Sequence, residues 1–463
     1  MELKGKKVLV VGLGKSGLAA ALFLRHKGAQ VTVSDIRSAE ALAKDIPALL
    51  DEGIMVEAGG HGLLTFRRQD LIVVSPGVPL NTPELVQARN FGRPVIGELE
   101  LAARFLKGKI LAITGSNGKT TTTTLAGEIL TEAGYPTVVA GNIGVPVVGV
   151  IEESTDDTWL VLEVSSFQLE STEEFHPRIA VILNITPDHL DRHGSFENYA
   201  LAKERIFAVQ DTNDSVVLNA DNPRTAEAAA RSHAPVYWFS AKHEVNRGAW
   251  AQNGTVFYRS ASDAGPEAAI EAILPLNKIS LKGEHNVENV LAAVCAARLA
   301  GVPSTVIARA IEKFHAVEHR LEYVATINGV EFYNDSKATN VDATAKAVAS
   351  FPGGIHLILG GKDKGSDYTT LSPLLRERVR AVYTIGAAAA KIESHLRGVL
   401  PIHSCETLAN AVGAAASAAR PGDVVLLAPA CSSFDQFESY EHRGRVFKQL
   451  VAEQKDWKAR QNA

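Results

Sequence analysis

The segment Thr114-Gly115-Ser116-Asn117-Gly118-Lys119-Thr120 combines the residue types that bind the phosphates of a nucleotide. It follows an apolar stretch at 109–114 that we expect to be a strand, and further threonines follow it at the start of an expected helix. In such loops the backbone N–H groups surround the phosphates, the lysine reaches the β and γ phosphates, and the threonine hydroxyl binds Mg²⁺. Position 113 is Ile, so the loop is a TGxxGKT variant of the strict Walker A pattern. The residues predicted to contact ATP here are Gly115, Ser116, Asn117, Gly118, Lys119, Thr120 and Thr121.

A second glycine-rich turn, Gly12-Leu13-Gly14-Lys15-Ser16-Gly17, lies between an expected strand at 8–11 and an expected helix. Asp35 ends the next expected strand, which completes the fingerprint of a dinucleotide-binding unit. Glycines let the backbone approach a pyrophosphate and the helix N-terminus stabilises its charge, so any diphosphate ligand would satisfy the pattern. The turn is therefore open to NAD, to another nucleotide diphosphate, or to a purely structural role.

Acidic and histidine side chains follow two expected strands of the central region. Glu163 lies at the end of the strand expected at 158–164, and Asp188, His189 and Asp191 follow the strand expected at 179–185. Parallel sheets bind ligands at the carboxyl ends of their strands. A strand-end carboxylate indicates a metal ligand, and the Asp188, His189 and Asp191 cluster indicates metal or phosphate chemistry rather than a lone structural histidine.

Lys203 lies on the apolar side of a helix expected at 195–208. Phe196, Tyr199 and Phe207 share its face at helical spacing, whereas Glu204 and Arg205 are expected to face outward. One interpretation is an aliphatic stem that places its ammonium at the rim of the protein. The other is a lysine buried near the metal and the phosphates, and the spacing does not choose between them.

Three polar segments follow expected strands in the last third of the chain. They are Asn334 to Asn340, Leu359 to Lys364 and Ala430 to Phe437. Because strand ends of one sheet share an edge, we expect the three loops to line one ligand cleft, although each alone could be a solvated turn. Cys431 has no neighbouring base in the sequence and is not predicted to be a nucleophile.

The elements that must position these residues alternate between β-branched apolar runs and Ala/Leu-rich helical stretches. That alternation is typical of parallel sheets covered by helices, so the predicted fold class is α/β. At 463 residues the chain is too long for one core. We predict a Rossmann-like domain at 1–98, a central P-loop-type mononucleotide-binding domain at 99–304, and a Rossmann-like α/β domain at 305–463. Residues Gly301 to Pro303 are a candidate hinge.

Composition narrows the function classes further. The formal net charge is -5 with both signs scattered along the chain, which offers no basic stripe for nucleic acid and no polybasic segment for a membrane. The three cysteines are far apart and form no CxxC pair, which fits a reducing compartment. Glycines interrupt the first apolar run before an export signal or a membrane span could form. We expect a cytoplasmic protein and a monomer.

Taken together, several motifs resemble the Mur ligase family, and the match runs across all three predicted domains. The motifs are TGSNGKTTT from Thr114, GNIG from Gly141, LEVSSFQLE from Leu162, NITPDHLDRH from Asn184 and GEHNVEN from Gly283. Within the family, NDSKATN, GGKDKGSDY and SSFDQF resemble the branch that adds D-glutamate, rather than those that add L-alanine, a diamino acid or a dipeptide.

The resemblance implies that the N-terminal turn holds the UDP end of UDP-N-acetylmuramoyl-L-alanine instead of NAD. It assigns Asp35 and Arg37 to uracil or ribose, and Asn142 to the sugar or phosphate of this substrate. The remaining UDP-binding residues that it implies are Gly14, Lys15, Ser16, Ser75 and Gly77. It also implies that Asn289 and Arg320 contact ATP.

For the chemistry, the resemblance implies two Mg²⁺ sites, with Thr120 and Glu163 binding one ion and His189 the other. It identifies Lys203 with the lysine that the family carries as a carbamate, which would make it a metal-directed anion. Lys119, Lys203, His189 and Glu163 are thus the predicted catalytic residues. The predicted D-glutamate contacts are Lys337, Thr339, Lys364, Ser433 and Tyr440. At position 440 the family pattern leads us to expect Phe, and the added hydroxyl is a departure.

The implied reaction is phosphorylation of the alanyl carboxylate by ATP, followed by attack of the amine of D-glutamate on the acyl phosphate. Closure of the third domain at the hinge would exclude water from that intermediate. Three alternatives remain: a nicotinamide-dependent oxidoreductase, a non-catalytic nucleotide-binding switch, and a sibling amide ligase such as a folylpolyglutamate synthase. The oxidoreductase leaves the central phosphate loop unexplained, and the N-terminal unit and the C-terminal loops argue against the folylpolyglutamate synthase.

Overall fold

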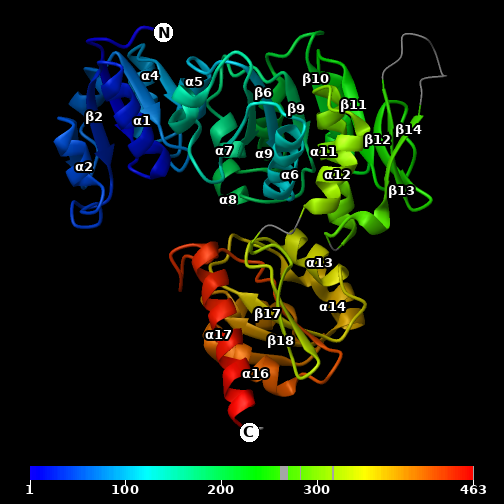
Figure 1. Cartoon of the computed structure of the whole chain (residues 1–463). Coiled ribbons are helices and arrows are strands. Elements are labelled where there is room, and N and C mark those ends of the chain that lie inside the picture. The colour runs from blue at the N-terminus through cyan, green and yellow to red at the C-terminus, as the bar shows by residue number, and fades with distance from the viewer. Residues whose placement is uncertain (261–269, 282, 315–317, 462–463) are drawn as a thin grey trace. The chain divides into compact units, whose positions relative to one another are not determined.

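The computed structural model describes residues 1–260, 270–281, 283–314 and 318–461. They divide into two compact units: unit 1 comprises 1–185, 197–276 and 288–311, and unit 2 comprises 186–196, 277–287 and 312–463. Figure 1 shows each unit as sheets covered by helices. Among the described residues, no helix is long and apolar enough to span a membrane.

Unit 1 begins with a parallel sheet that the described residues form in the order β3-β2-β1-β4-β5. Its strands are β1 (Lys7–Val11), β2 (Gln30–Asp35), β3 (Met55–Ala58), β4 (Leu71–Val74) and β5 (Val95–Gly97). Its helices are α1 (Lys15–His26), α2 (Ile46–Asp51), α3 (Leu63–Arg67), α4 (Pro83–Asn90) and α5 (Glu98–Ala103). This is the 3-2-1-4-5 part of the Rossmann strand order, and it places the glycine turn after β1 at the centre of the sheet edge.

The second sheet of unit 1 has the order β14-β13-β12-β11-β10-β9-β6-β8-β7 among the described residues. Its strands are β6 (Lys109–Thr114), β7 (Thr137–Gly141), β8 (Trp159–Glu163), β9 (Ile179–Ile182), β10 (Ser215–Asn219), β11 (Val236–Ser240), β12 (Gly248–Gln252), β13 (Thr255–Arg259) and β14 (Ile270–Pro275). The phosphate-loop strand β6 lies between β8 and β9, in parallel with both. The strand ends that carry Glu163 and Asn184 are therefore the immediate neighbours of the loop.

The helices that follow along the chain are α6 (Lys119–Glu132), α7 (Ser166–Leu169), α8 (Leu190–His193), α9 (Phe196–Glu204), α10 (Pro223–Ala228), α11 (Glu284–Leu299) and α12 (Ser304–Lys313). Short 3₁₀ turns are η1 (Val147–Glu153), η2 (Arg205–Phe207), η3 (Ala229–Arg231) and η4 (Leu276–Lys278). The helix expected at 195–208 thus ends at Glu204 and continues as the 3₁₀ turn η2.

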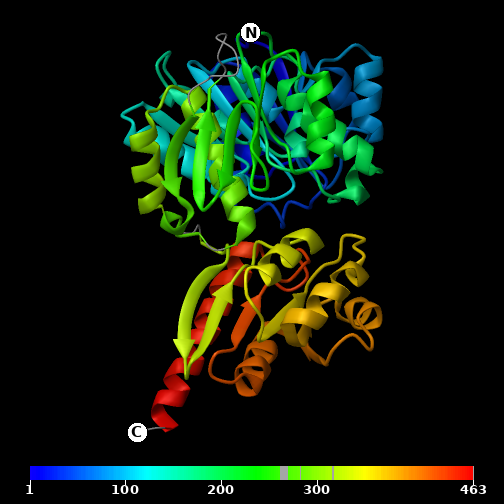
Figure 2. The ribbon, with the colours of Figure 1, turned by 90° about the vertical axis from the view of Figure 1, so that its right-hand side faces the viewer.

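Unit 2 contains a sheet of order β15-β16-β20-β17-β18-β19 among its described residues. Its strands are β15 (Glu322–Ile327), β16 (Val330–Asn334), β17 (Ile355–Gly360), β18 (Val379–Ile385), β19 (Ile402–Glu406) and β20 (Val424–Leu427). Its other elements are α13 (Val341–Ala349), η5 (Tyr368–Leu371), α14 (Ser372–Arg378), α15 (Ala389–His395), α16 (Leu408–Ala418) and α17 (Tyr440–Gln461). In Figure 2 the yellow-green hairpin of β15 and β16 lies along the red helix α17, which it contacts.

The core of unit 2 follows from the alternation of side chains along its strands. Leu357 and Leu359 of β17 join one buried apolar cluster, whereas Ile358 between them joins a second cluster on the other face. The first cluster includes residues of α13 and α14, and the second includes residues of α16 and α17. Because both faces are covered, every residue of β17 is buried, as predicted for a parallel sheet, and the polar His356 among them bonds to the Tyr383 hydroxyl.

The prediction of parallel sheets is incomplete at two edges. β12, β13 and β14 pair antiparallel, and so do β15 and β16. The 240s to 260s, whose sequence indicates irregular or hairpin-like structure, contain the antiparallel pair β12 and β13, while 261–269 lie outside the described residues. β15 and β19 were not predicted, since their residues are only partly buried and alternate with polar side chains.

Candidate active site

The phosphate loop takes a conformation that requires glycine at its last turn. Gly118 has a φ of 89° and begins α6. An added Cβ there would lie 2.1 Å from Oδ1 of Asn289, a residue of α11. Both the backbone angle and the close approach therefore exclude a larger side chain. The contact also brings Asn289, which the resemblance assigns to ATP, beside the loop.

Asn184 anchors the loop from the end of β9. Its Oδ1 accepts from the backbone N–H of Asn117 at 2.8 Å, and its Nδ2 donates to the Asn117 carbonyl at 3.0 Å. The backbone N–H of Ser116 donates to the Asn184 carbonyl at 2.9 Å. Sequence reasoning missed this residue. The available signal was an asparagine directly after an apolar strand, because such a side chain can pair with the backbone of a neighbouring loop.

Two lysines converge on the same oxygen of this loop. Nζ of Lys119 and Nζ of Lys203 each donate to the Gly115 carbonyl at 2.8 Å, and Lys119 also donates to the Ser116 carbonyl at 2.9 Å. Lys203 is only 1% exposed and its Nζ lies 4.7 Å from the centre of the Tyr199 ring. This burial rules out an ammonium at the rim of the protein. The Lys203 ammonium instead adds positive charge to the loop where the phosphates of a nucleotide would bind.

The helix that carries Lys203 differs from the prediction at the next residue. Glu204 was expected to face outward, but it is buried and pairs with Arg224 at 2.6 Å and with Arg231 at 2.5 Å. A buried carboxylate needs such partners, and these arginines come from η3 and α10, which periodicity cannot anticipate.

Glu163 is buried at the end of β8 and its carboxylate is held on both oxygens. The hydroxyl of Thr120 donates to Oε2 at 2.7 Å, and Nδ2 of Asn142 donates to Oε1 at 2.9 Å. The structure thus joins the predicted metal ligands Thr120 and Glu163, and it adds Asn142, which was assigned to the UDP-linked substrate. A carboxylate and a hydroxyl beside a phosphate loop are oxygen donors of the kind that bind Mg²⁺, so these residues fit that ion.

At the N-terminal glycine turn, a close contact explains the glycine at position 17. A Cβ on Gly17 would lie 1.9 Å from the Gly12 carbonyl oxygen, which also accepts from the Ser75 hydroxyl at 2.6 Å. Gly14 and Gly77 have no described heavy atom within 4 Å of an added Cβ. Ser75, which directly follows β4, therefore holds the turn through this hydrogen bond. The space beside Gly14 and Gly77 is open. Lys15 and Ser16 form the first turn of α1.

Asp35 is already engaged by protein groups. It accepts from the backbone N–H of Leu13 at 2.7 Å, and Nε and Nη2 of Arg37 donate to its two oxygens at 3.0 and 2.8 Å. Burial would raise the pKa of Asp35, but the hydrogen bonds from Arg37 and Leu13 lower it to about 2. The structure thus brings the predicted pair Asp35 and Arg37 together as an ion pair at the turn.

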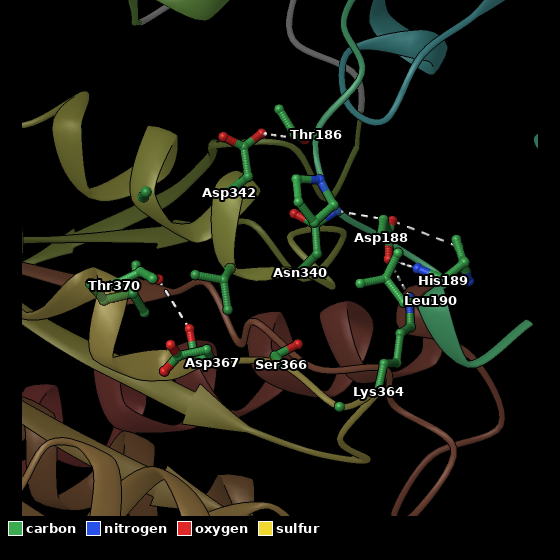
Figure 3. Close-up of a pocket in the computed structure, with 15 residues that line it drawn as sticks. Thr186, Asp188, His189, Leu190, Asn340, Asp342, Lys364, Ser366, Asp367 and Thr370 are labelled. Carbon is green, nitrogen blue, oxygen red and sulfur yellow. Dashed lines mark hydrogen bonds and ion pairs between the residues drawn. The ribbon is translucent and has the colours of Figure 1, made fainter. Parts of the chain in front are cut away.

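In unit 2, His189 and Lys364 meet at Asp188. Oδ1 of Asp188 lies 3.6 Å from Nζ of Lys364, and its Oδ2 accepts from Nδ2 of Asn340 at 3.1 Å and lies 3.6 Å from Nε2 of His189. Figure 3 shows these side chains around a cavity of about 540 Å³. His189 has a φ of 53°, a left-handed conformation that costs a non-glycine residue about 1–2 kcal/mol. Asp188 belongs to the cluster predicted for metal or phosphate chemistry, and Asn340 ends one of the predicted polar loops, but neither was assigned a ligand individually.

Lys337 and Tyr440 form a second group in unit 2. Nζ of Lys337 lies 5.1 Å from the centre of the Tyr440 ring, and the Tyr440 carbonyl accepts from the Ser336 hydroxyl at 2.8 Å. The backbone N–H of Thr339 donates to the Lys337 carbonyl at 2.8 Å. The ring of Tyr440, where the family pattern leads us to expect Phe, thus lies beside Lys337.

Arg443 connects the three polar loops, and sequence reasoning missed it. It is fully buried, and its guanidinium donates to the carbonyls of Ser336 at 2.8 Å and Cys431 at 3.1 Å and to the Ser336 hydroxyl at 3.0 Å. Weaker bonds of 3.5 and 3.4 Å reach the carbonyls of Gly360 and Ser432. Burial lowers its pKa to about 10, so it remains charged at neutral pH. Through these bonds the buried guanidinium contacts at least one residue in each of the three loops.

The three loops therefore meet, but only two of them line the cavity. Residues 340–342 and 364–367 contribute to its wall, whereas Ser433 is not among the lining residues. Ser433 is buried and its carbonyl accepts from the backbone N–H of Phe437 at 2.9 Å. The expectation of a single cleft lined by all three loops is thus met only in part.

Arg320 lies in unit 2 beside Asp335. Burial raises the pKa of Asp335 to about 6, while the charge of Arg320 opposes that shift. Nε of Arg320 is buried and has no hydrogen-bond partner among the described residues. Asn289 lies in unit 1, so the two residues predicted to contact ATP outside the phosphate loop belong to different units.

Comparisons with known proteins match three regions of the chain to domain families. Residues 6–97 match the "Mur ligase MurD-like, N-terminal domain", 113–297 the "Mur ligase middle domain", and 319–431 the "Mur ligase, glutamate ligase domain". These matches confirm the predicted three-domain α/β architecture.

Relatives in two bacteria match along nearly the whole chain. A protein of Acidobacterium capsulatum named UDP-N-acetylmuramoylalanine--D-glutamate ligase is 69% identical over all of both chains. A protein of Koribacter versatilis with the same name is 60% identical over 97% of this chain and 98% of its own.

Solved structures show the same fold at low identity. UDP-N-acetylmuramate-alanine ligase MurC of Thermotoga maritima has a TM-score of 0.59 at 20% identity, over 97% of this chain and 100% of its own. MurF ligase of Thermotoga maritima in complex with ADP also has a TM-score of 0.59, at 18% identity, over 92% of this chain and 95% of its own.

Proposed function

Because the chain belongs to the Mur ligase family, we propose that it joins D-glutamate to UDP-N-acetylmuramoyl-L-alanine in peptidoglycan synthesis. The observation that carries this proposal is the 69% identity to a D-glutamate ligase over the full length of both chains. The chain is an ATP-dependent amide ligase, and its phosphate loop has the lysine and threonine that such an enzyme needs.

We assign the first half of the reaction to the phosphate loop. An oxygen of the alanyl carboxylate attacks the γ-phosphorus of ATP, the bond to the β-phosphate oxygen breaks, and acyl phosphate and ADP form. Lys119 donates to two loop carbonyls, within the same turn that would surround the phosphates. Its transfer from those carbonyls to the phosphate oxygens would supply charge stabilisation, the main contribution a protein makes to phosphoryl transfer.

Thr120 and Glu163 would hold Mg²⁺ beside this loop, with Lys203 as a further ligand if it is carbamylated and His189 at a second ion. Bound Mg²⁺ neutralises charge on the phosphates. Asn142 keeps the Glu163 carboxylate in place through its 2.9 Å hydrogen bond. The two-ion arrangement and the carbamate are predictions that activity and metal titrations can test.

We assign the second half of the reaction to the loops of unit 2. The amine of D-glutamate attacks the acyl carbon, phosphate leaves with the former carboxylate oxygen, and the amine gives up a proton. Lys337, Thr339, Lys364, Ser433 and Tyr440 are the proposed contacts of the amino acid. Lys337 and Lys364 offer two cations, which matches a substrate with two carboxylates.

The test is phosphate release from ATP and Mg²⁺ with UDP-N-acetylmuramoyl-L-alanine and one of three additions: D-glutamate, L-glutamate or a diamino acid. We expect release with D-glutamate alone. Release with a different amino acid would keep the ligase and overturn the assignment of unit 2. ATP binding without amino-acid-dependent release would favour a nucleotide switch, and NADH binding would favour an oxidoreductase.

The monomeric state, the cytoplasmic location and the boundaries near 98 and 304 stay predictions.

A further inference from the structure

The loop that carries Lys364 forms one wall of the unit 2 cavity. Lys364, Gly365, Ser366 and Asp367 line it in succession, and Asp188, Asn340 and His189 line the opposite part. A loop of small and polar residues has little packing of its own to keep it in one conformation. Besides the contact of Lys364 with Asp188 inside the cavity, groups outside it must therefore hold the backbone of this loop.

Asp363, directly before Lys364, is such a group. Its Oδ1 accepts from the Tyr368 hydroxyl at 2.7 Å and from the backbone N–H of Ser366 at 3.2 Å, and its Oδ2 accepts from Nζ of Lys391 at 2.7 Å. Burial would raise the pKa of Asp363, but the hydrogen bonds from Lys391 and Tyr368 lower it to about 2. The Asp363 carboxylate thus connects Ser366 and Tyr368, which follow Lys364, to Lys391 of α15.

Tyr368 extends this hold to a second loop. Its side chain is fully buried, and its hydroxyl oxygen lies 3.0 Å from Sγ of Cys431, which is also fully buried. Cys431 precedes Ser433 by two residues. The backbones of the two loops also pair, since Lys362 N–H donates to the Ser432 carbonyl at 2.9 Å and Ser432 N–H donates back at 3.2 Å. The loop with Lys364 and the loop with Ser433 are therefore fixed to each other.

We propose that Asp363 and Tyr368 are positioning residues that set the separation of Lys364 and Ser433, and thereby the affinity for an amino acid with two carboxylates. The inference rests on the proposed function, because Lys364 and Ser433 are its proposed contacts. Neither Asp363 nor Tyr368 is among the residues that line the cavity. Their effect is confined to the amino-acid step, since no hydrogen bond described for either residue reaches the phosphate loop.

The variants are Tyr368→Phe, which removes only the hydroxyl, and Asp363→Asn, which keeps the shape and removes the charge. The matched control is Tyr383→Phe in β18 of the same unit. Tyr383 is equally buried, and its hydroxyl lies 2.9 Å from Nδ1 of His356, but it does not line the cavity. It therefore reports the loss of one buried hydrogen bond of unit 2 that has no connection to Lys364.

Two readouts separate positioning from a general loss of stability. The first is the KM for D-glutamate, which we expect to rise about tenfold in Tyr368→Phe and further in Asp363→Asn. The second is acyl phosphate formed without D-glutamate and trapped with hydroxylamine, which should stay at the level of the unmodified enzyme. Tyr383→Phe should change neither. An unchanged KM in both variants, or an equal rise in Tyr383→Phe, would overturn the inference.

The unmodified enzyme distinguishes this inference from the proposed function. If it forms acyl phosphate but completes the reaction with another amino acid, the proposed function fails. The same comparison run with that amino acid then decides the inference: a KM raised in Tyr368→Phe supports the positioning role, and an unchanged KM refutes it.

Discussion

In the phosphate loop, the residues assigned to ATP are consecutive in the chain, whereas those assigned to D-glutamate come from three loops of unit 2 and from the start of α17. The first site is held by its own strand neighbours, chiefly by the pairing of Asn184 with Asn117. The second is held by the buried Arg443 and the partly buried Asp363, which lie outside the contacts they support.

This difference shows how much of each site is formed by residues that are neighbours in the sequence. Phosphates are recognised by backbone N–H groups and one lysine, so a short run of residues contains most of the site. An amino acid is recognised by side chains on several strand ends, so its site depends on how the loops are fixed to each other. Substitutions should therefore act on different steps of the reaction in the two regions.

The largest expected effect is that of Lys203→Ala in the phosphate region. Lys203 is buried and donates to the Gly115 carbonyl, so its loss removes charge beside the phosphates whether or not it is carbamylated. We expect phosphate release to fall by about 10³-fold, in the range of losses seen when preorganised charge is removed. A short carboxylate added to the variant should restore part of the rate if the carbamate is present.

The control for Lys203 is Lys109→Ala, an exposed lysine at the start of β6 in the same sheet. Its turnover should equal that of the unmodified enzyme. Full activity of Lys203→Ala would show that Lys203 has no role in the phosphate site. It would also contradict the contrast between the two regions.

An intermediate effect is expected for Arg443→Met in the amino-acid region. The change leaves the carbonyls of Ser336 and Cys431 without their buried donor, and each such loss costs about 1–3 kcal/mol. We expect the KM for D-glutamate to rise by about tenfold or more, with a lower melting temperature and unchanged acyl phosphate formation. Arg443→Lys keeps the charge but cannot reach several carbonyls at once, so it should recover little. An equal loss of both half-reactions would show that the two regions are not separable.

The smallest effect is expected for Glu98→Gln, outside both regions. Glu98 is 1% exposed, its Oε1 accepts from the backbone N–H of Val148 at 2.7 Å, and its Oε2 has no hydrogen-bond partner among the described residues. Burial raises the pKa of Glu98 from 4.5 to about 7. Because the folded-state pKa is the higher one, the folded state loses stability as the pH rises from 4.5 to 7.

Glu98→Gln should therefore gain stability over the unmodified protein above pH 7, by at most about 3 kcal/mol, and gain nothing below pH 4.5. Urea unfolding at pH 5 and pH 8 measures this difference. The contrasting variant is Glu100→Gln, since the Glu100 carboxylate accepts from three backbone N–H groups and from Arg104 and should lose stability instead. A gain of the same size at both pH values would refute the burial explanation, and neither variant should alter the KM for D-glutamate.

The prediction of elements succeeded where a local pattern was enough. The apolar strands that carry Thr114 and Glu163 lie where the sequence indicates, because fully buried parallel strands are apolar without interruption. The edge strands β15, which is antiparallel, and β19, which is parallel, were missed, because partly exposed strands carry a weaker pattern. Glu204 was misplaced because its arginine partners are distant in the sequence.

By itself, the sequence determined the α/β class, the phosphate loop, and the residue types available for a ligase of this family. Those features depend on periodicity and on contiguous motifs, which are local. Only the tertiary structure decided that Lys119 and Lys203 share one carbonyl, that Asn142 holds Glu163, and that Arg443 and Asp363 fix the amino-acid loops. These contacts join residues far apart in the chain, and they exist because buried polar groups must find partners once the sheets have packed.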